Sequence, residues 1–212
     1  MTAPGPAAVP LPMFPLATVL FPHALLPLHV FEPRYRVLVH DCLHQGREFG
    51  VVLIERGHEI GGGDARFGVG TVAHIREAAE LADGRWALVC TGTRRVAVRS
   101  WLPDDPYPVA LVEDRPEGAL TAATHDHLAT AEGAVRRALA LAGELDEAAA
   151  PPDVALDPDP AVAAWQLAAL APVGPVDHQR LLEIDDPAAR LDLLAGLAAD
   201  ASVLLAYRLS GG

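Results

Sequence analysis

The two histidines at positions 40 and 44 have the spacing that most readily supports metal chemistry. Residues four apart share one face of an α-helix, so His40 and His44 could offer two imidazole ligands to one cation. Asp41 lies on an adjacent strip of the same predicted helix, and no further ligand is evident. His125 and His127 are two apart at another predicted helix start, so their rings point apart. We therefore expect no metal site, and His44 would instead interact with the helix dipole when charged.

A glycine-containing segment, residues 68–73, matches the dinucleotide-binding pattern G-x-G-x-x-A. That chemistry requires a strand before the segment and a helix after it, so that the helix N-terminus can bind a pyrophosphate. Here the residues before the segment are Gly-Gly-Asp-Ala-Arg, and residues 69–75 form a run typical of a β-strand. We therefore predict a strand at this position and no cofactor site.

Nucleophilic catalysis would need an activated serine, cysteine or lysine, and the sequence shows no residue of these types in an activating pattern. All 16 basic residues are arginines, so a Ser–Lys dyad, a P-loop lysine and a Schiff base are excluded. No G-x-S-x-G motif surrounds Ser100, Ser202 or Ser210, and Ser202 suits packing with a backbone hydrogen bond. Cys42 and Cys90 lie among apolar residues, which predicts buried, inert thiols. We expect no catalytic residues and no enzyme activity.

The composition and charge of the chain limit the classes of partner that it is expected to bind. The chain has 212 residues, 51% of them apolar, and a net charge of −12, which disfavours DNA, RNA and anionic membranes as partners. Residues 1–10 lack the features of a secretory signal, and prolines and histidines interrupt the apolar stretch 16–31, so we expect a cytoplasmic protein without membrane spans. The adjacent Arg94 and Arg95 are interpreted as solvated charge at a turn, with an anion or RNA contact as the alternative.

The first half of the chain has the pattern of a β-rich unit. Short apolar runs separated by prolines over 10–28 predict edge strands and loops. A helix is predicted over 33–46, because proline suits its first position and glycine its C-terminal cap. Its apolar face comprises Tyr35, Leu38, Val39, Cys42 and Leu43. Strand-like runs follow at 49–55, 69–75, 86–91, 95–101 and 109–113, with turn clusters at 61–64, 83–84 and 103–106. This pattern indicates a small, partly closed barrel.

The second half is rich in alanine and leucine and predicts helices over 121–145, 161–171, 176–184 and 187–209. The last helix has Asp186 as its N-cap and Pro187 at its first position. Its packing face comprises Leu191, Leu194, Ala198, Ala201 and Leu205. We predict an α+β fold with a flexible tail over 1–9, a β-rich subdomain over 10–118 and a helical subdomain over 119–212.

Residues 11–16 (LPMFPL), 19–22 (VLFP) and 26–35 (LPLHVFEPRY) resemble the opening of the Lon protease N-terminal, substrate-binding domain. Residues 92–96 (GTRRV) and 107–113 (YPVALVE) look like later strands of that domain, and residues 178–187 (HQRLLEIDDP) resemble its helical half. The likeness covers about residues 10–207. It is nearest to short bacterial proteins that carry this domain alone, and more distant from the Lon-like domain of cereblon.

The resemblance implies a PUA-like β-barrel lobe followed by a helical bundle. In full-length Lon proteases an ATPase module and a Ser–Lys protease follow the last helix, and the printed sequence contains neither. The resemblance further implies that Phe31 and Tyr35 enter the core while Arg34 ties down a loop. It also implies a surface that recognises unfolded or tagged polypeptides.

Our functional hypothesis is therefore a non-catalytic module that captures polypeptide segments as an adaptor in proteolysis or quality control. The alternatives are a PUA-like module that binds RNA or a small ligand and, less favoured, a hydrolase. Prolines place Phe14, Leu20, Phe21 and Leu25 on short segments that cannot all point into one core. We expect some of them to line an apolar groove between barrel and helical lobe, the alternative being that all four are core. The oligomeric state stays open.

Overall fold

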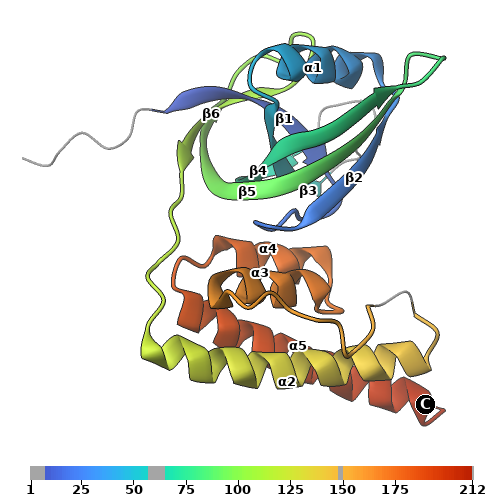
Figure 1. The fold of residues 1–212 in the computed structure, drawn as a ribbon, viewed down its shortest axis with the longest axis vertical. Helices are drawn as coiled ribbons and strands as arrows, with labels where there is room; N and C mark the ends of the chain where they lie inside the picture. The colour runs from blue at the N-terminus through green and yellow to red at the C-terminus, as the bar shows by residue number, and fades with distance from the viewer. Residues whose placement is uncertain (1–7, 57–64, 148–149, 212) are drawn as a thin grey trace, which may run out of the picture. The chain divides into compact units, whose positions relative to one another are not determined.

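The computed structural model describes residues 8–56, 65–147 and 150–211, which contain one six-stranded mixed sheet and five helices (Figure 1). The α+β class predicted from the sequence is confirmed at this level. The chain divides into two compact units, unit 1 (Met1–Pro116) and unit 2 (Glu117–Gly212). The turn cluster expected at 61–64 and residues 1–7 of the expected tail lie outside the described residues.

Unit 1 carries the sheet. Its strands are β1 (Val9–Leu16), β2 (Leu25–Val30), β3 (Glu48–Arg56), β4 (Ala65–Glu80), β5 (Trp86–Trp101) and β6 (Val109–Asp114). Their order is β2-β5-β4-β3-β1-β6, and β6 pairs with β5 as well as with β1. The β1–β3 pair is parallel, and the other pairs are antiparallel. The pairings from β1 through β3, β4, β5 and β6 therefore return to β1, while β2 lies outside this cycle.

The two runs predicted as separate strands at 86–91 and 95–101 form the single strand β5, which corrects the sequence interpretation. Its first part pairs with β2 and its last part with β6. Gly92 lies inside β5 and does not interrupt it. It is required because a Cβ there would lie 2.2 Å from the carbonyl oxygen of Phe21. The glycine thus serves a close approach between backbones and not a turn.

The G-x-G-x-x-A segment lies inside β4, so the prediction of a strand is confirmed. A Cβ on Gly70 would lie 2.2 Å from the carbonyl oxygen of Val51 in the neighbouring strand β3. Packing between strands therefore accounts for this glycine, and no helix follows the segment to bind a pyrophosphate.

Helix α1 (Pro33–His44) covers an apolar cluster of unit 1. Its residues Tyr35, Leu38, Val39 and Cys42 are buried as predicted, and Leu43 packs against the same cluster. Phe31 was expected in the core and is instead 53% exposed, which corrects that prediction. The side chain of Val30 points inward at the end of β2, so Phe31 follows on the opposite side.

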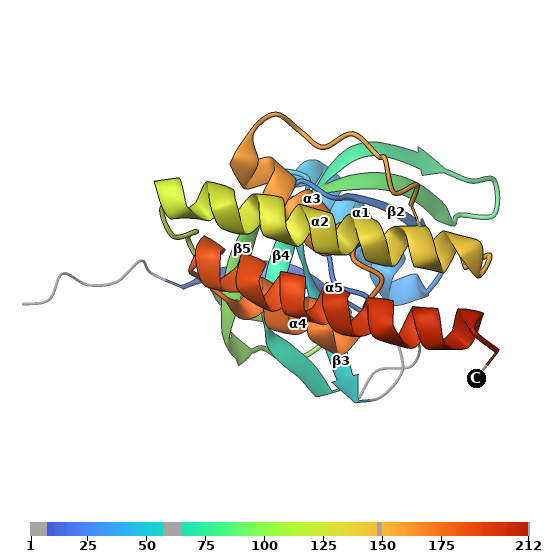
Figure 2. The same cartoon turned by 90° about the horizontal axis from the view of Figure 1, so that it is seen from below.

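Unit 2 consists of α2 (Ala122–Glu144), α3 (Pro160–Leu170), α4 (Pro175–Glu183) and α5 (Pro187–Leu209), close to the predicted ranges. Helices α2 and α5 lie side by side along most of their length (Figure 2). Asp186 caps α5 as predicted, because its carboxylate accepts from the backbone N–H of Ala188 at 3.2 Å. None of the helices in the described ranges is long and apolar enough to cross a membrane.

A buried arginine organises the interior of unit 2. Arg190 is 1% exposed, and its guanidinium carbon lies 3.6 Å from the ring centroid of Trp165. It donates hydrogen bonds to the carboxylate of Glu117 and, at 3.3 Å, to the carbonyl oxygen of Ile184. One side chain therefore joins the segment before α2, helix α3 and the end of α4.

Candidate functional site

Strand β2 ends the strand order of unit 1, and β5 is its only strand partner within the residues that the structure describes. The backbone N–H of Gly92 donates to the carbonyl oxygen of Ala24 at 2.9 Å, which sets the alternation of hydrogen bonds along the pair. With the register Leu25↔Thr91, residues 26, 28 and 30 direct their backbone groups toward β5. Leu25, Pro27 and His29 therefore direct theirs toward the other edge.

Pro27 occupies the middle of that edge, and proline has no N–H to donate. A polypeptide added there as a further strand would find backbone donors at Leu25 and His29 but none between them. Such a proline is one of the ways in which proteins discourage uncontrolled pairing of edge strands. Recognition at β2 would therefore depend mainly on side chains.

Apolar side chains project along this strand. Leu25 is 70% exposed and Phe31 is 53% exposed, although both are large and apolar. Pro27 is also exposed and faces the 36% exposed Val89 of β5. We name the residues Leu25, Pro27, His29, Phe31 and Val89 the β2 surface.

Two hollows adjoin the β2 surface and share Leu28 and His29. The first, of about 310 Å³, is lined by Phe14, Leu16, Leu28, His29, Val30, Phe31, Glu32 and Tyr35. The second, of about 340 Å³, is lined by Pro27, Leu28, His29, Glu77, Ala78, Ala79, Ala87, Leu88 and Val89. Both have mainly apolar linings with one carboxylate each, which suits apolar side chains better than a charged metabolite.

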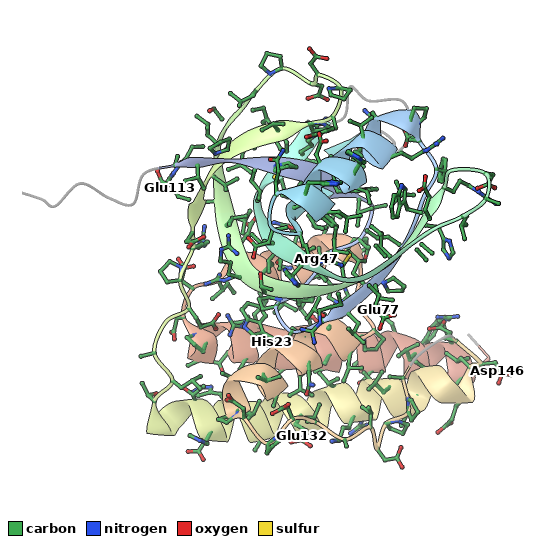
Figure 3. All side chains as sticks on the ribbon, turned by 45° about the horizontal axis from the view of Figure 1, so that its top comes forward. His23, Arg47, Glu77, Glu113, Glu132 and Asp146 are labelled. Carbon is green, nitrogen blue, oxygen red and sulfur yellow. The ribbon has the colours of Figure 1, made fainter. Side chains whose placement is uncertain are left out.

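The two carboxylates differ in their surroundings. Glu32 accepts a hydrogen bond from Nε of Arg34 at 3.1 Å, and the Arg34 guanidinium carbon lies 4.5 Å from the ring centroid of Tyr35. Glu77, which Figure 3 labels, is exposed. It lines the second hollow and has no ion pair with a residue in the described ranges. Among the described residues, the second hollow is therefore the one whose carboxyl group has no arginine paired with it.

The four residues predicted to bind polypeptide lie in different environments. Phe14, Leu20 and Phe21 are buried, at 8%, 3% and 2% exposure, whereas Leu25 is on the surface. Phe14 stacks on Tyr35 with ring centroids 4.1 Å apart and also lines the first hollow. Binding through any of the four stays a prediction, and Leu25 is the residue that a partner could reach without rearrangement.

Sequence reasoning did not select His29, Phe31 or Val89. A period-two pattern starting at Leu25 would have indicated Pro27, His29 and Phe31, because alternate strand residues share a face. Val89 had no comparable signal, because its position beside Pro27 depends on the pairing of β2 with β5.

The remaining candidates for chemistry have structural surroundings. The rings of His40 and His44 are 4.5 Å apart, but the structure groups no three potential metal ligands within its described ranges. Nδ1 of His44 lies 2.7 Å from the carbonyl oxygen of His40, and His127 pairs with Asp192 across α2 and α5. Ser202 donates to the carbonyl oxygen of Ala198 at 2.9 Å, as predicted.

Both thiols are buried, as predicted. Burial raises the pKa of Cys42 to about 12, and Sγ of Cys42 donates to the carbonyl oxygen of Glu48 at 3.2 Å. Burial also raises the pKa of Cys90 to about 12. Neither thiol would be ionised at neutral pH, and the thiolate is the nucleophilic form.

The arginine pair requires a correction. Arg94 is on the surface, where it binds Glu48 and Asp114 at 3.0 Å, but Arg95 is only 2% exposed and is not solvated. Nη2 of Arg95 donates to the carbonyl oxygen of Pro116 at 3.1 Å. This buried hydrogen bond shows that Arg95 is part of the interior, although its neighbours in the sequence predicted a solvated position at a turn.

Comparisons with known proteins agree with this architecture. A family model for the ATP-dependent protease La (LON) substrate-binding domain matches residues 10–200. Lon protease 2 of Herpetosiphon aurantiacus is 30% identical over 193 residues, which are 87% of this chain and 23% of that protein. Lon protease 2 of Sorangium cellulosum is 33% identical over 119 residues, which are 55% of this chain and 15% of that protein. The chain thus spans less than a quarter of these curated relatives.

Solved structures extend the comparison. A Lon N-terminal domain protein from Xanthomonas campestris is 32% identical with a TM-score of 0.63, covering 89% of this chain and 98% of that one. The N-terminal domain of Mycobacterium avium complex Lon protease, 17% identical with a TM-score of 0.66, shares the fold over 91% of this chain and 99% of its own. This chain therefore belongs to the family of Lon (ATP-dependent protease La) substrate-binding domains.

Proposed function

We propose that this protein is a non-catalytic module that captures unfolded or exposed polypeptide segments on the β2 surface. The observation that carries the proposal is the exposure of Leu25 on β2 and of Phe31 just after it, next to two mainly apolar hollows, on a strand whose second edge has no strand partner among the described residues. The family assignment supports the same function, because its model describes a substrate-binding domain of a protease. The cycle of paired strands in unit 1 supports a PUA-like barrel as the scaffold, followed by a helical bundle.

Apolar side chains of the captured segment would occupy the two hollows, while Pro27 limits backbone pairing. Burial of one large apolar side chain contributes about 1.5–3 kcal/mol, and association has a cost of several kcal/mol. Two such anchors contribute about 3–6 kcal/mol before that cost, less than the roughly 8 kcal/mol of a micromolar complex, so they set only a weak interaction to which further contacts of the segment must add. Weak, sequence-tolerant binding suits an adaptor that presents proteins for proteolysis or quality control in the cytoplasm.

Two features favour this function over RNA binding and over catalysis. The net charge is −12, and surface arginines such as Arg94 and Arg99 are paired with carboxylates, which reduces attraction for phosphates. The chain has no lysine, and its two thiols are buried, so we propose no cofactor and no hydrolytic activity.

The test is a titration of the protein into fluorescently labelled, reduced casein, followed by anisotropy at low and high salt. We expect weak binding that changes little with salt, because apolar contacts are not screened. The double variant Leu25→Ser/Phe31→Ser should weaken binding about tenfold or more, in line with the loss of two apolar anchors. The matched control is Val176→Ser, which removes an apolar side chain that is 60% exposed on α4.

Equal binding by the double variant and the control would refute the β2 surface as the site. If casein binding is absent and single-stranded RNA binds with steep salt dependence, the RNA-binding alternative replaces the proposal. Incubation with casein and ATP should show neither proteolysis nor ATP hydrolysis.

A further inference from the structure

The last turns of α5 expose large apolar side chains far from β2 in the sequence. Val203, Leu204 and Tyr207 are 69%, 66% and 65% exposed. Residues three and four apart share one face of a helix, so these three form a single ridge. A contiguous apolar patch of this kind is a candidate interaction surface.

A hollow of about 500 Å³ adjoins the ridge. It lies between α2 and α5 and is lined by Ala134, Arg137, Ala199, Ser202, Val203 and Ala206. Four of the six are alanine or serine, so the hollow exists because small side chains leave room where the two helices meet. Figure 2 shows α2 and α5 side by side in this part of unit 2. The hollow shares Val203 with the ridge, so this side of α5 combines projecting apolar side chains with free space beside them.

Charges at the ends of the ridge are also self-complementary. Asp200 and Arg208 lie four residues before and after Leu204, on the same stripe of α5. With a rise of about 1.5 Å per residue, each lies roughly 6 Å along the helix axis from Leu204. Asp200 is exposed and has no ion pair with a residue that the structure describes. Arg208 binds Glu147 and, with five N–H donors, can bind a second carboxylate.

We propose that the protein forms a twofold dimer in which α5 packs antiparallel against α5 of a second copy, centred on Leu204. This arrangement places Asp200 of each copy opposite Arg208 of the other and packs the exposed apolar side chains of the two ridges against each other. A parallel pair would instead place Asp200 opposite Asp200 and Arg208 opposite Arg208. The order of charges along the stripe therefore favours a second copy in the antiparallel orientation.

The proposal is independent of polypeptide capture on unit 1 and has its own test. Sedimentation velocity of the full chain should show a monomer–dimer equilibrium with a micromolar Kd. Asp200→Arg and Arg208→Asp, each alone, should weaken the dimer at least tenfold, because each places like charges opposite one another. An equimolar mixture of the two variants should associate again, because their heterodimer pairs an arginine with an aspartate at both ends.

Leu204→Glu should abolish the dimer, and Val176→Ser on α4 should leave it unchanged. Thermal unfolding of each variant checks that the helices remain folded. If the wild-type protein stays monomeric up to about 100 μM, its self-association is too weak for a Kd in the micromolar range. That result would overturn the proposal and leave the ridge to a different partner. A dimer that tolerates both charge reversals, or a mixture of the two that fails to associate, would also overturn it.

Discussion

Unit 1 and unit 2 stabilise their interiors in different ways. The main cluster of unit 1 is apolar and combines α1 with strands far apart in the sequence, through residues such as Phe14, Leu38 and Ile75. Unit 2 places small side chains between long helices and adds the buried Arg190, whose partners come from three separate segments. Unit 1 also buries a cation, Arg95, but outside this apolar cluster. The apolar cluster of unit 1 should therefore be most sensitive to the introduction of a charge, and the interior of unit 2 to the removal of Arg190.

The largest effect is expected from Leu38→Asp in unit 1. Leu38 is fully buried in the apolar cluster, so the substitution removes apolar burial and places a carboxylate without a partner in the interior. We expect the free energy of unfolding to fall by about 4 kcal/mol or more, enough to unfold a marginally stable chain. Urea unfolding followed by circular dichroism measures it.

The control is the neighbouring residue on the same helix. Val37 is 42% exposed, so Val37→Asp adds the same charge to α1 at a solvated position. Its effect should stay within about 1 kcal/mol. Equal destabilisation by the two substitutions would mean that the inner face of α1 has been wrongly identified.

Removal of the buried cation from unit 2 should have the next largest effect. Arg190→Ala leaves the Glu117 carboxylate without this partner and uncovers one face of Trp165. Since the Glu117 side chain is 30% exposed and can recover some hydration, we expect a loss of about 3 kcal/mol. Arg180→Ala is the control, because Arg180 pairs with Asp177 on the surface and should cost less than about 1 kcal/mol. Similar unfolding midpoints for both variants would contradict a central role for Arg190.

Local signals in the sequence predicted most of the elements. Pro33 and Asp186 marked two helix starts because their effects are local: a fixed φ angle and a carboxylate that accepts backbone hydrogen bonds. The continuity of β5 could not be predicted in this way, since β5 pairs along its length with β2, β4 and β6, which are other parts of the chain. Arg95 was misplaced for a related reason, because its acceptor, Pro116, lies 21 residues away.

The candidate site shows the same limit. Prolines between residues 10 and 28 correctly indicated short segments at the start of the sheet. They did not show which side chains point inward, and Leu20 proved to be buried while Leu25 is exposed. Local alternation could have indicated Phe31, but the hollows next to it arise from residues of several strands and α1. A site that depends on such tertiary neighbours cannot be predicted from one stretch of sequence.

The dependence of stability on pH distinguishes the two units by the direction of change. Burial raises the pKa of Cys42 and of Cys90 in unit 1 from 9.0 to about 12. Between these values the unfolded thiols lose their protons while the folded ones keep theirs, so stability falls as pH rises from about 9 to about 12. Each thiol should account for about 1.4 kcal/mol per pH unit at most. Urea unfolding at pH 8 and pH 10 should show this loss, reduced in Cys42→Ala/Cys90→Ala.

Unit 2 should respond at the acid end instead. Burial lowers the pKa of His178 below its usual 6.5, and Nε2 of His178 lies 3.2 Å from the carbonyl oxygen of Ala171. As pH falls through 6.5 the unfolded imidazole takes up a proton before the folded one does, so this group makes folding less stable toward lower pH. His178→Gln keeps a side-chain donor but cannot titrate. It should reduce the loss of stability between pH 7 and pH 5 and leave the loss of stability above about pH 9 unchanged. If His178→Gln instead changed the loss of stability above about pH 9, or the two alanine substitutions changed the loss between pH 7 and pH 5, the assignment of these two effects to separate units would be wrong.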